Sequence, residues 1–72
     1  MLTKDVTIDS EWSLLSRGNS YYLYVQNLSK QPVLYSYDLS QENRVLLGML
    51  KFDRDVFVRT IEGENTLIVT EE

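Results

Sequence analysis

A chain of 72 residues is long enough for one small domain, and without cysteine it has no disulfide to stabilise its core. It also has no histidine, which is the usual general base and the commonest metal ligand at neutral pH. Seven basic against eleven acidic residues give a net charge of −4, and no basic cluster marks a nucleic-acid surface. Of the devices that stabilise small domains, association with further subunits is the one left open.

The two ends of the chain are expected to carry little of the fold. We expect one β domain over residues 1–72, with a short N-terminal arm over about residues 1–5 and a charged tail at residues 71–72. No apolar run approaches the ~20 residues of a membrane span, and the first residues lack the apolar core of a signal peptide. The expectation is a soluble protein made in the cytoplasm, with no membrane partner.

Two short strands are expected ahead of the first turn. Residues 6–8 alternate apolar and polar side chains. Residues 12–16 suit either a strand or one turn of helix, and the strand is preferred because the turn-forming residues 17–20 follow. Trp12 is the single tryptophan. It is expected in the core, with an exposed contact as the alternative.

The tyrosine-rich segment 21–37 is the expected centre of the fold. It holds all five tyrosines and the only proline, and it predicts a hairpin of two strands joined by the polar turn at residues 28–31. One face of its first strand carries Tyr22 and Tyr24, which either line the rim of a sandwich or cover a subunit or ligand surface. Asn27, just before the turn, is expected to cap backbone groups. The candidate interface residues are Tyr22, Tyr24, Tyr35, Tyr37 and Trp12.

Three further strands are expected in the second half of the chain. A polar loop at residues 38–43 leads to residues 44–50, which predict a strand broken or bulged at Gly48 because glycine disfavours a helix interior. The next strand has two distinct faces, one of which carries Phe57, Arg59 and Ile61. The remaining expected elements are a turn at residues 52–55, that strand at 56–61, a turn at 62–65 and a closing strand at 66–70.

These elements define the expected fold class. Short strands at intervals of about ten residues, separated by turns, are typical of all-β domains. We therefore expect a small antiparallel β-sandwich or barrel of about six to seven short strands.

Catalytic constellations are missing from the sequence. No histidine is present to activate a serine, no cysteine can act as a nucleophile, and the three glycines are isolated. Asp53 and Asp55 form the closest carboxylate pair and would suit a calcium ion, but Arg54 lies between them. A solvated turn, or an ion pair of one aspartate with Arg54 or Arg59, is the preferred interpretation. We therefore expect no enzyme, and no catalytic, cofactor or metal site.

Four segments of the chain, taken in sequence order, are the basis of a resemblance to a known class of proteins. They are Trp12-Ser-Leu-Leu, Tyr22-Leu-Tyr-Val-Gln-Asn27, Pro32-Val-Leu-Tyr-Ser36 and Thr66-Leu-Ile-Val. In this order the chain resembles small all-β virion proteins and the tail or fibre modules of tailed bacteriophages. The resemblance implies a structural role in a virion, with copies assembling on a capsid, tail or fibre, often with threefold or higher symmetry.

Three functions are open at this point. The first is a non-enzymatic structural protein of a phage particle, which contacts identical subunits or other virion proteins. The second is a small phage-encoded regulator that binds a host protein. The third is a carbohydrate-binding module in which Trp12 or a tyrosine stacks on a sugar ring. We favour the first, as a homo-oligomer.

Overall fold

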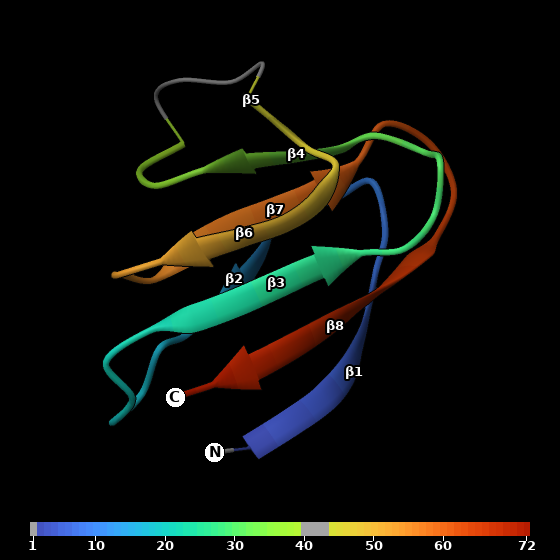
Figure 1. The fold of residues 1–72 in the computed structure, drawn as a ribbon. Coiled ribbons are helices and arrows are strands. Elements are labelled where there is room, and N and C mark those ends of the chain that lie inside the picture. Colours follow the sequence, from blue (N-terminus) through green and yellow to red (C-terminus); the bar gives the residue numbers. More distant parts are fainter. Residues whose placement is uncertain (1, 40–43) are drawn as a thin grey trace.

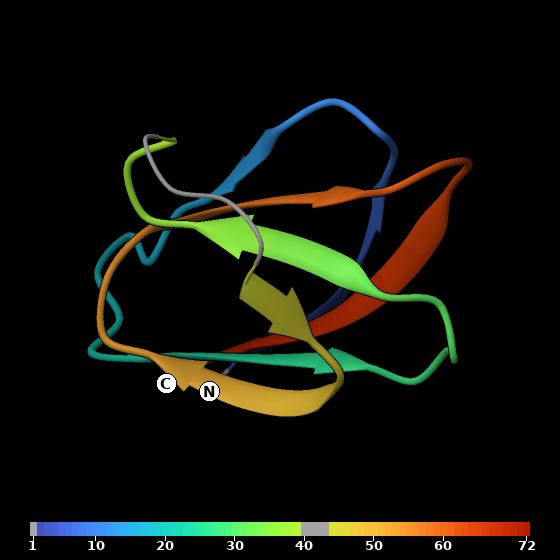
Figure 2. The ribbon, with the colours of Figure 1, turned by 90° about the horizontal axis from the view of Figure 1, so that it is seen from above.

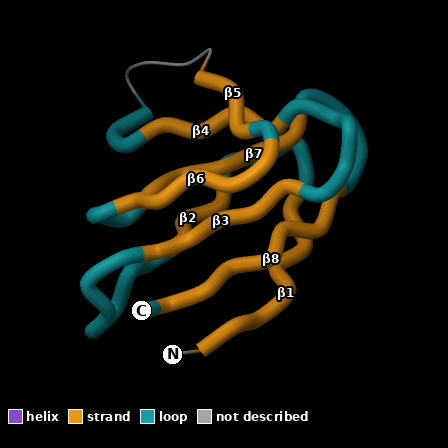
Figure 3. The backbone as a smooth tube through the Cα atoms, viewed as in Figure 1, coloured by secondary structure: helices purple, strands orange, loops and turns teal. Residues whose placement is uncertain are grey.

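The protein folds as two stacked β-sheets. The computed structural model describes residues 2–39 and 44–72, and within them eight strands form two four-stranded antiparallel sheets (Figure 1). Residues 40–43 of the predicted polar loop lie outside the described residues. Figure 3 shows only strand and loop along the described backbone. The strands are β1 (Leu2–Ile8), β2 (Ser13–Leu15), β3 (Leu23–Asn27), β4 (Val33–Ser36), β5 (Arg44–Leu46), β6 (Gly48–Phe52), β7 (Val56–Thr60) and β8 (Asn65–Glu71).

The two sheets pack face to face as a sandwich. Sheet I has the strand order β1-β8-β3-β6, and sheet II has the order β2-β7-β4-β5. Seen from above, the two layers lie on opposite sides of the molecule (Figure 2). The predicted all-β fold is confirmed, as two open sheets rather than a closed barrel. The described residues form eight strands instead of about six to seven, because the segment at 44–50 belongs to two of them.

The core lies between the sheets, because the strands turn alternate side chains inward. Leu23 and Val25 of β3 are fully buried, as are Val56 and Val58 of β7 in the opposite sheet. Burial of a side chain of this size stabilises a fold by about 1.5–3 kcal/mol. The buried cluster consists of Ile8, Leu15, Leu23, Val25, Val33, Leu46, Phe52, Val56, Val58, Leu67 and Val69.

The predicted tyrosine hairpin is wrong in its pairing. Both of its strands are present, but β3 pairs with β6 and β8 in sheet I, whereas β4 pairs with β5 and β7 in sheet II. Residues 28–32 therefore carry the chain across the sandwich from one layer to the other (Figure 2). The physical reason is that each strand has its own apolar inward face, so the two cover the core from opposite sides.

The predicted break at Gly48 is confirmed, and it is also a change of sheet. Strand β5 ends at Leu46 in sheet II, and β6 begins at Gly48 in sheet I. Gly48 has a φ of 75°, in the left-handed region that glycine enters without steric cost. Only Leu47 separates the two strands, so the glycine lets the chain turn the corner within a single residue.

Strands β1 and β8 pair along their whole length, so the expected N-terminal arm is instead the first part of a strand. Leu2 lies directly opposite Glu71, which the sequence placed in a charged tail. Threonine hydroxyls meet across the pair, with 3.2 Å between the Oγ1 atoms of Thr3 and Thr70. Both ends of the chain thus belong to sheet I and lie near each other (Figure 1).

Candidate functional site

The five candidate interface residues occupy three separate places. Tyr22 and Tyr24 lie on the outer face of sheet I, since Leu23 between them points into the core. The Nζ of Lys51 lies 3.9 Å from the ring centre of Tyr22 and 5.9 Å from that of Tyr24. The ammonium is attracted to the negative faces of the rings, and it covers part of them. This tyrosine pair is therefore on the surface, with a cation of the same chain over it.

Tyr35 and Tyr37 turn toward the core instead. Both rings meet Phe52 edge to face, with centroids 5.2 Å and 6.0 Å from its centroid. Such aromatic pairs contribute about 0.5–1.5 kcal/mol each beyond the area that they bury. The two side chains pack against the buried cluster between the sheets, away from the tyrosine pair on the outer face of sheet I.

Trp12 lies on the outer face of sheet II, half-buried and outside the buried cluster. The expectation of a core position is corrected by this placement. The guanidinium carbon of Arg59 lies 5.2 Å from the centre of the indole ring. Leu14, two residues further along the chain, points to the same side because side chains alternate along an extended segment.

The outer face of sheet II carries apolar side chains on all four of its strands. Leu14 of β2 lies opposite Phe57 of β7, and Leu34 of β4 lies between Arg59 and Val45 of the flanking strands. Leu14 is 52 % exposed and Val45 is 47 % exposed. We call this surface the tryptophan face, and it consists of Trp12, Leu14, Leu34, Val45, Phe57 and Arg59.

Of this face, only Trp12 is among the contact residues that the sequence predicts. The alternation in β7 placed Phe57 and Arg59 on one side of a strand, but it did not indicate whether that side faces solvent. In β4 and β5 successive residues such as Val33 and Leu34 are both apolar, so their pattern does not predict which of the two faces solvent. Only the pairing of the strands brings these side chains together.

Arg59 is the one charged residue of the tryptophan face. Its guanidinium lies over Trp12, and its Nε is buried without a hydrogen-bond partner. In the described part of the chain, no carboxylate forms an ion pair with it. A carboxylate stabilises a partly desolvated guanidinium, so Arg59 is a potential binding site for a carboxylate within an apolar surface.

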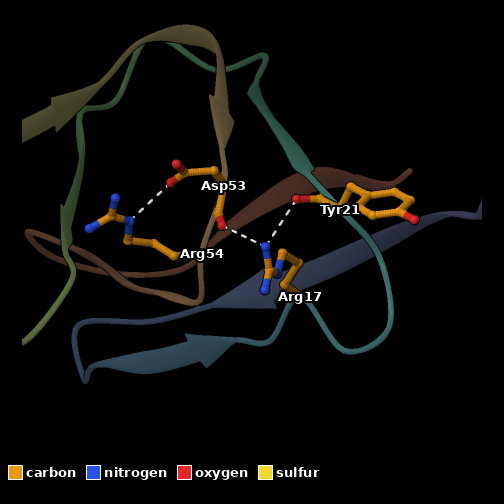
Figure 4. A network of polar contacts seen from close by, with 4 residues as sticks. All are labelled: Arg17, Tyr21, Asp53 and Arg54. Atoms are coloured by element: carbon orange, nitrogen blue, oxygen red, sulfur yellow. Dashed lines mark hydrogen bonds and ion pairs between the residues drawn. The ribbon is translucent and has the colours of Figure 1, made fainter.

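Asp53 and Asp55 are each engaged by a nearby arginine at one end of the sandwich. The Nε of Arg54 donates a 2.9 Å hydrogen bond to Oδ1 of Asp53, so the predicted ion pair is confirmed. This hydrogen bond is the main reason why the pKa of Asp53 lies below its ordinary value of 3.8. The backbone N–H of Arg17 donates to Oδ1 of Asp55 over 2.7 Å. In Figure 4 the Arg17 side chain joins two loops, since its Nη1 donates to the carbonyl oxygens of Tyr21 and Asp53 over 3.2 Å and 2.7 Å.

Asn27 caps backbone groups at the opposite end, as predicted. Its Nδ2 donates to the carbonyl oxygens of Gln31 and Leu46 over 2.8 Å and 3.0 Å. Its Oδ1 accepts hydrogen bonds from the backbone N–H and the hydroxyl of Ser29 and from Nδ2 of Asn65. The side chain therefore joins the crossing after β3 to the end of β5 and the start of β8, and it has a structural role.

A hollow of about 300 Å³ opens between the edge strands β1 and β2. Val6, Leu15 and Val69 contribute aliphatic walls, and Lys4 and Glu71 at its rim pair with each other over 3.8 Å. Among the described residues, no three acidic side chains come together in a way that could hold a metal ion. The tryptophan face is therefore the feature best suited to contact with another molecule.

The assignment of a function rests on this geometry, because comparisons with known proteins found no protein-family model, curated protein or solved structure that matches the chain. Over residues 2–39 and 44–72, no helix is long and apolar enough to cross a membrane.

Proposed function

We propose that this protein is a non-enzymatic structural protein that assembles with further copies of itself through the tryptophan face. The observation that carries the proposal is the exposure of Leu14 and Val45, which lie on the two edge strands of one sheet face that also carries the half-buried Trp12 and Phe57. Among the described residues of this face, Leu34 is buried and Leu14 and Val45 are the exposed apolar side chains. Burial of apolar surface contributes roughly 25 cal/mol per Å², so a contact here would stabilise both subunits.

The size of the chain also supports assembly. A domain of 72 residues without disulfides buries a modest fraction of its surface when it folds alone. Contact with a neighbouring subunit extends the buried area beyond the single core between sheets I and II. The resemblance to phage virion modules suggests a particle, in which many copies repeat one contact, as the setting for this assembly.

The tyrosine pair on sheet I is the second candidate contact. Tyr22 is exposed, but Lys51 already lies over its ring. The cation–π contact satisfies the ring within the same chain, whereas Leu14 and Val45 present aliphatic side chains to solvent. For the same reason Trp12, with Arg59 over its ring, is poorly placed to stack on a sugar. These contacts favour protein assembly through the tryptophan face over carbohydrate binding.

Sedimentation velocity over a range of concentrations tests the proposal. We expect the wild-type protein to associate reversibly, and we expect a variant with Leu14→Ser and Val45→Ser to remain monomeric with an unchanged far-ultraviolet spectrum. Met49→Ser is the matched control, because Met49 is an exposed apolar residue on sheet I. A variant with Tyr22→Ala and Tyr24→Ala tests the second candidate contact.

Two outcomes would overturn the proposal. One is a wild-type protein that stays monomeric at its highest soluble concentration. The other is association that survives the double serine variant. Its loss in Met49→Ser or in the double tyrosine variant would then place the contact on sheet I. Co-purification of the protein with phage particles, or its absence from them, tests the virion setting separately.

A further inference from the structure

The tryptophan face combines apolar side chains with a cation that has no carboxylate partner among the described residues. Arg59 lies over Trp12, and its buried Nε donates to no acceptor. Its two terminal amines donate no hydrogen bond within the described residues and are not among the buried unpaired atoms, so they face solvent. An apolar surface with one available guanidinium is complementary to a carboxylate that is flanked by apolar groups.

This charge limits how two tryptophan faces can meet. If two copies packed face to face about the centre of the surface, the Arg59 of one copy would approach the Arg59 of the other. Like charges in a desolvated contact cost free energy instead of stabilising it. A different part of the second copy, one that offers a carboxylate, is a more favourable occupant of this face.

Several acidic side chains among the described residues already have partners within the same chain. Asp53 pairs with Arg54, and Asp55 accepts a hydrogen bond from the backbone of Arg17. Glu71 lies 3.8 Å from Lys4 at the edge of sheet I. Among the remaining acids, the best candidates are those that stand next to an exposed apolar side chain.

The turn between β7 and β8 has this chemistry. Ile61 is 56 % exposed, and Glu62 and Glu64 are exposed and form no ion pair within the described residues. Gly63 lies between the two glutamates with a φ of 74°, which gives a tight turn where the chain crosses from sheet II to sheet I. The turn thus presents two carboxylates and one aliphatic side chain together.

We propose that the turn at residues 61–64 of one copy docks on the tryptophan face of a second copy. Glu62 and Glu64 supply carboxylates to the guanidinium of Arg59, and Ile61 packs against the apolar side chains around it. This inference rests on the proposed function, because it specifies the two surfaces that meet in the assembly. Each copy carries one turn and one face, which allows either a twofold dimer with reciprocal docking or a ring or open chain of successive copies.

Charge reversal on the two surfaces tests the contact. Arg59→Glu sets a carboxylate against the acidic turn of the next copy, and Glu62→Lys with Glu64→Lys sets two ammonium groups against Arg59. We expect each variant alone to associate at least about tenfold more weakly than the wild-type protein in sedimentation velocity. A mixture of the two variants should associate, because the intact turn of one fits the intact face of the other and the two reversed charges also attract each other.

Lys51→Glu is the matched control, since Lys51 is likewise a cation over an aromatic ring but lies on sheet I. It changes the net charge as Arg59→Glu does, and it should associate as the wild-type protein does. Far-ultraviolet circular dichroism checks that each variant folds. If Arg59→Glu does not fold, the turn variant decides the question, because its substitutions fall on exposed side chains.

The outcomes separate this inference from the proposed function. A monomeric wild-type protein would overturn both. Association that is lost with Leu14→Ser and Val45→Ser but persists in the turn variant would overturn the docking of the turn and leave the tryptophan face as the contact. A mixture of the two charge variants that stays monomeric, although each is folded, would also overturn the docking of the turn.

Discussion

Replacement of Asn27 by alanine should destabilise the fold strongly, although Asn27 belongs to no apolar cluster. The side chain is 3 % exposed and makes five hydrogen bonds. Four of these involve Gln31, Ser29 and Asn65, which lie where water can replace part of the lost bonding. Loss of the fifth bond removes the donor to the carbonyl oxygen of Leu46, which is a buried residue.

The size of the effect follows from these contacts. A buried polar group left without a partner costs about 1–3 kcal/mol, and the bonds that water can replace cost less. We expect Asn27→Ala to lower the free energy of unfolding by about 2–4 kcal/mol. A domain of this length has a total stability of roughly 4–11 kcal/mol, so the variant should unfold at a clearly lower urea concentration.

Urea titration followed by the fluorescence of Trp12 and by circular dichroism measures the change. Asn19→Ala is the matched control, because Asn19 is an exposed asparagine whose side chain makes no hydrogen bond within the described residues. It should change the free energy of unfolding by no more than about 0.5 kcal/mol. If Asn27→Ala is equally mild, the hydrogen bonds at this end of the sandwich do not stabilise the crossing from β3 to β4, and the reasoning fails.

Two further predictions concern the backbone corner and the arginine pair. Gly48→Ala should cost about 1–2 kcal/mol in urea titration, because a Cβ meets open space there but a φ of 75° is strained for alanine; an unchanged midpoint would contradict this. Arg54→Ala should raise the pKa of Asp53 toward 3.8 in carbon-detected NMR titration, because the hydrogen bond from Arg54 is the main cause of its lowered pKa. The pKa of Asp53 is lower in the folded protein than in the unfolded chain. Ionisation of Asp53 therefore stabilises the fold above about pH 4, and this stabilisation is lost as the pH falls through the folded pKa. A pKa that does not move in Arg54→Ala would contradict the assigned cause.

Much of the local structure followed from the sequence. Alternation of apolar residues identified the strands that became β3 and β7, and Gly48 marked the break between β5 and β6. The turn-forming residues at 17–20 and 62–65 marked boundaries between strands for steric reasons that hold in any fold. The ion pair of Asp53 with Arg54 was also predictable, since the two residues are neighbours in the chain.

The pairing of the strands was decided only by the tertiary structure. Neighbouring strands such as β3 and β4 look like a hairpin in sequence, but the turn between them crosses the sandwich. The same holds for β7 and β8, which flank the clearest turn in the chain and belong to different sheets. Alternation describes the two faces of one strand, whereas pairing depends on contacts between residues far apart in the chain.

The candidate site shows the same division. The sequence by itself determined that Trp12, a set of tyrosines and alternating apolar side chains belong to an all-β domain without cysteine or histidine. It did not determine which of these side chains meet. The tertiary structure placed Tyr35 and Tyr37 against Phe52 and left Trp12 outside the core beside Arg59. The physical reason is that several strands carry apolar side chains on both faces, and only the packing of the second sheet decides which face is buried.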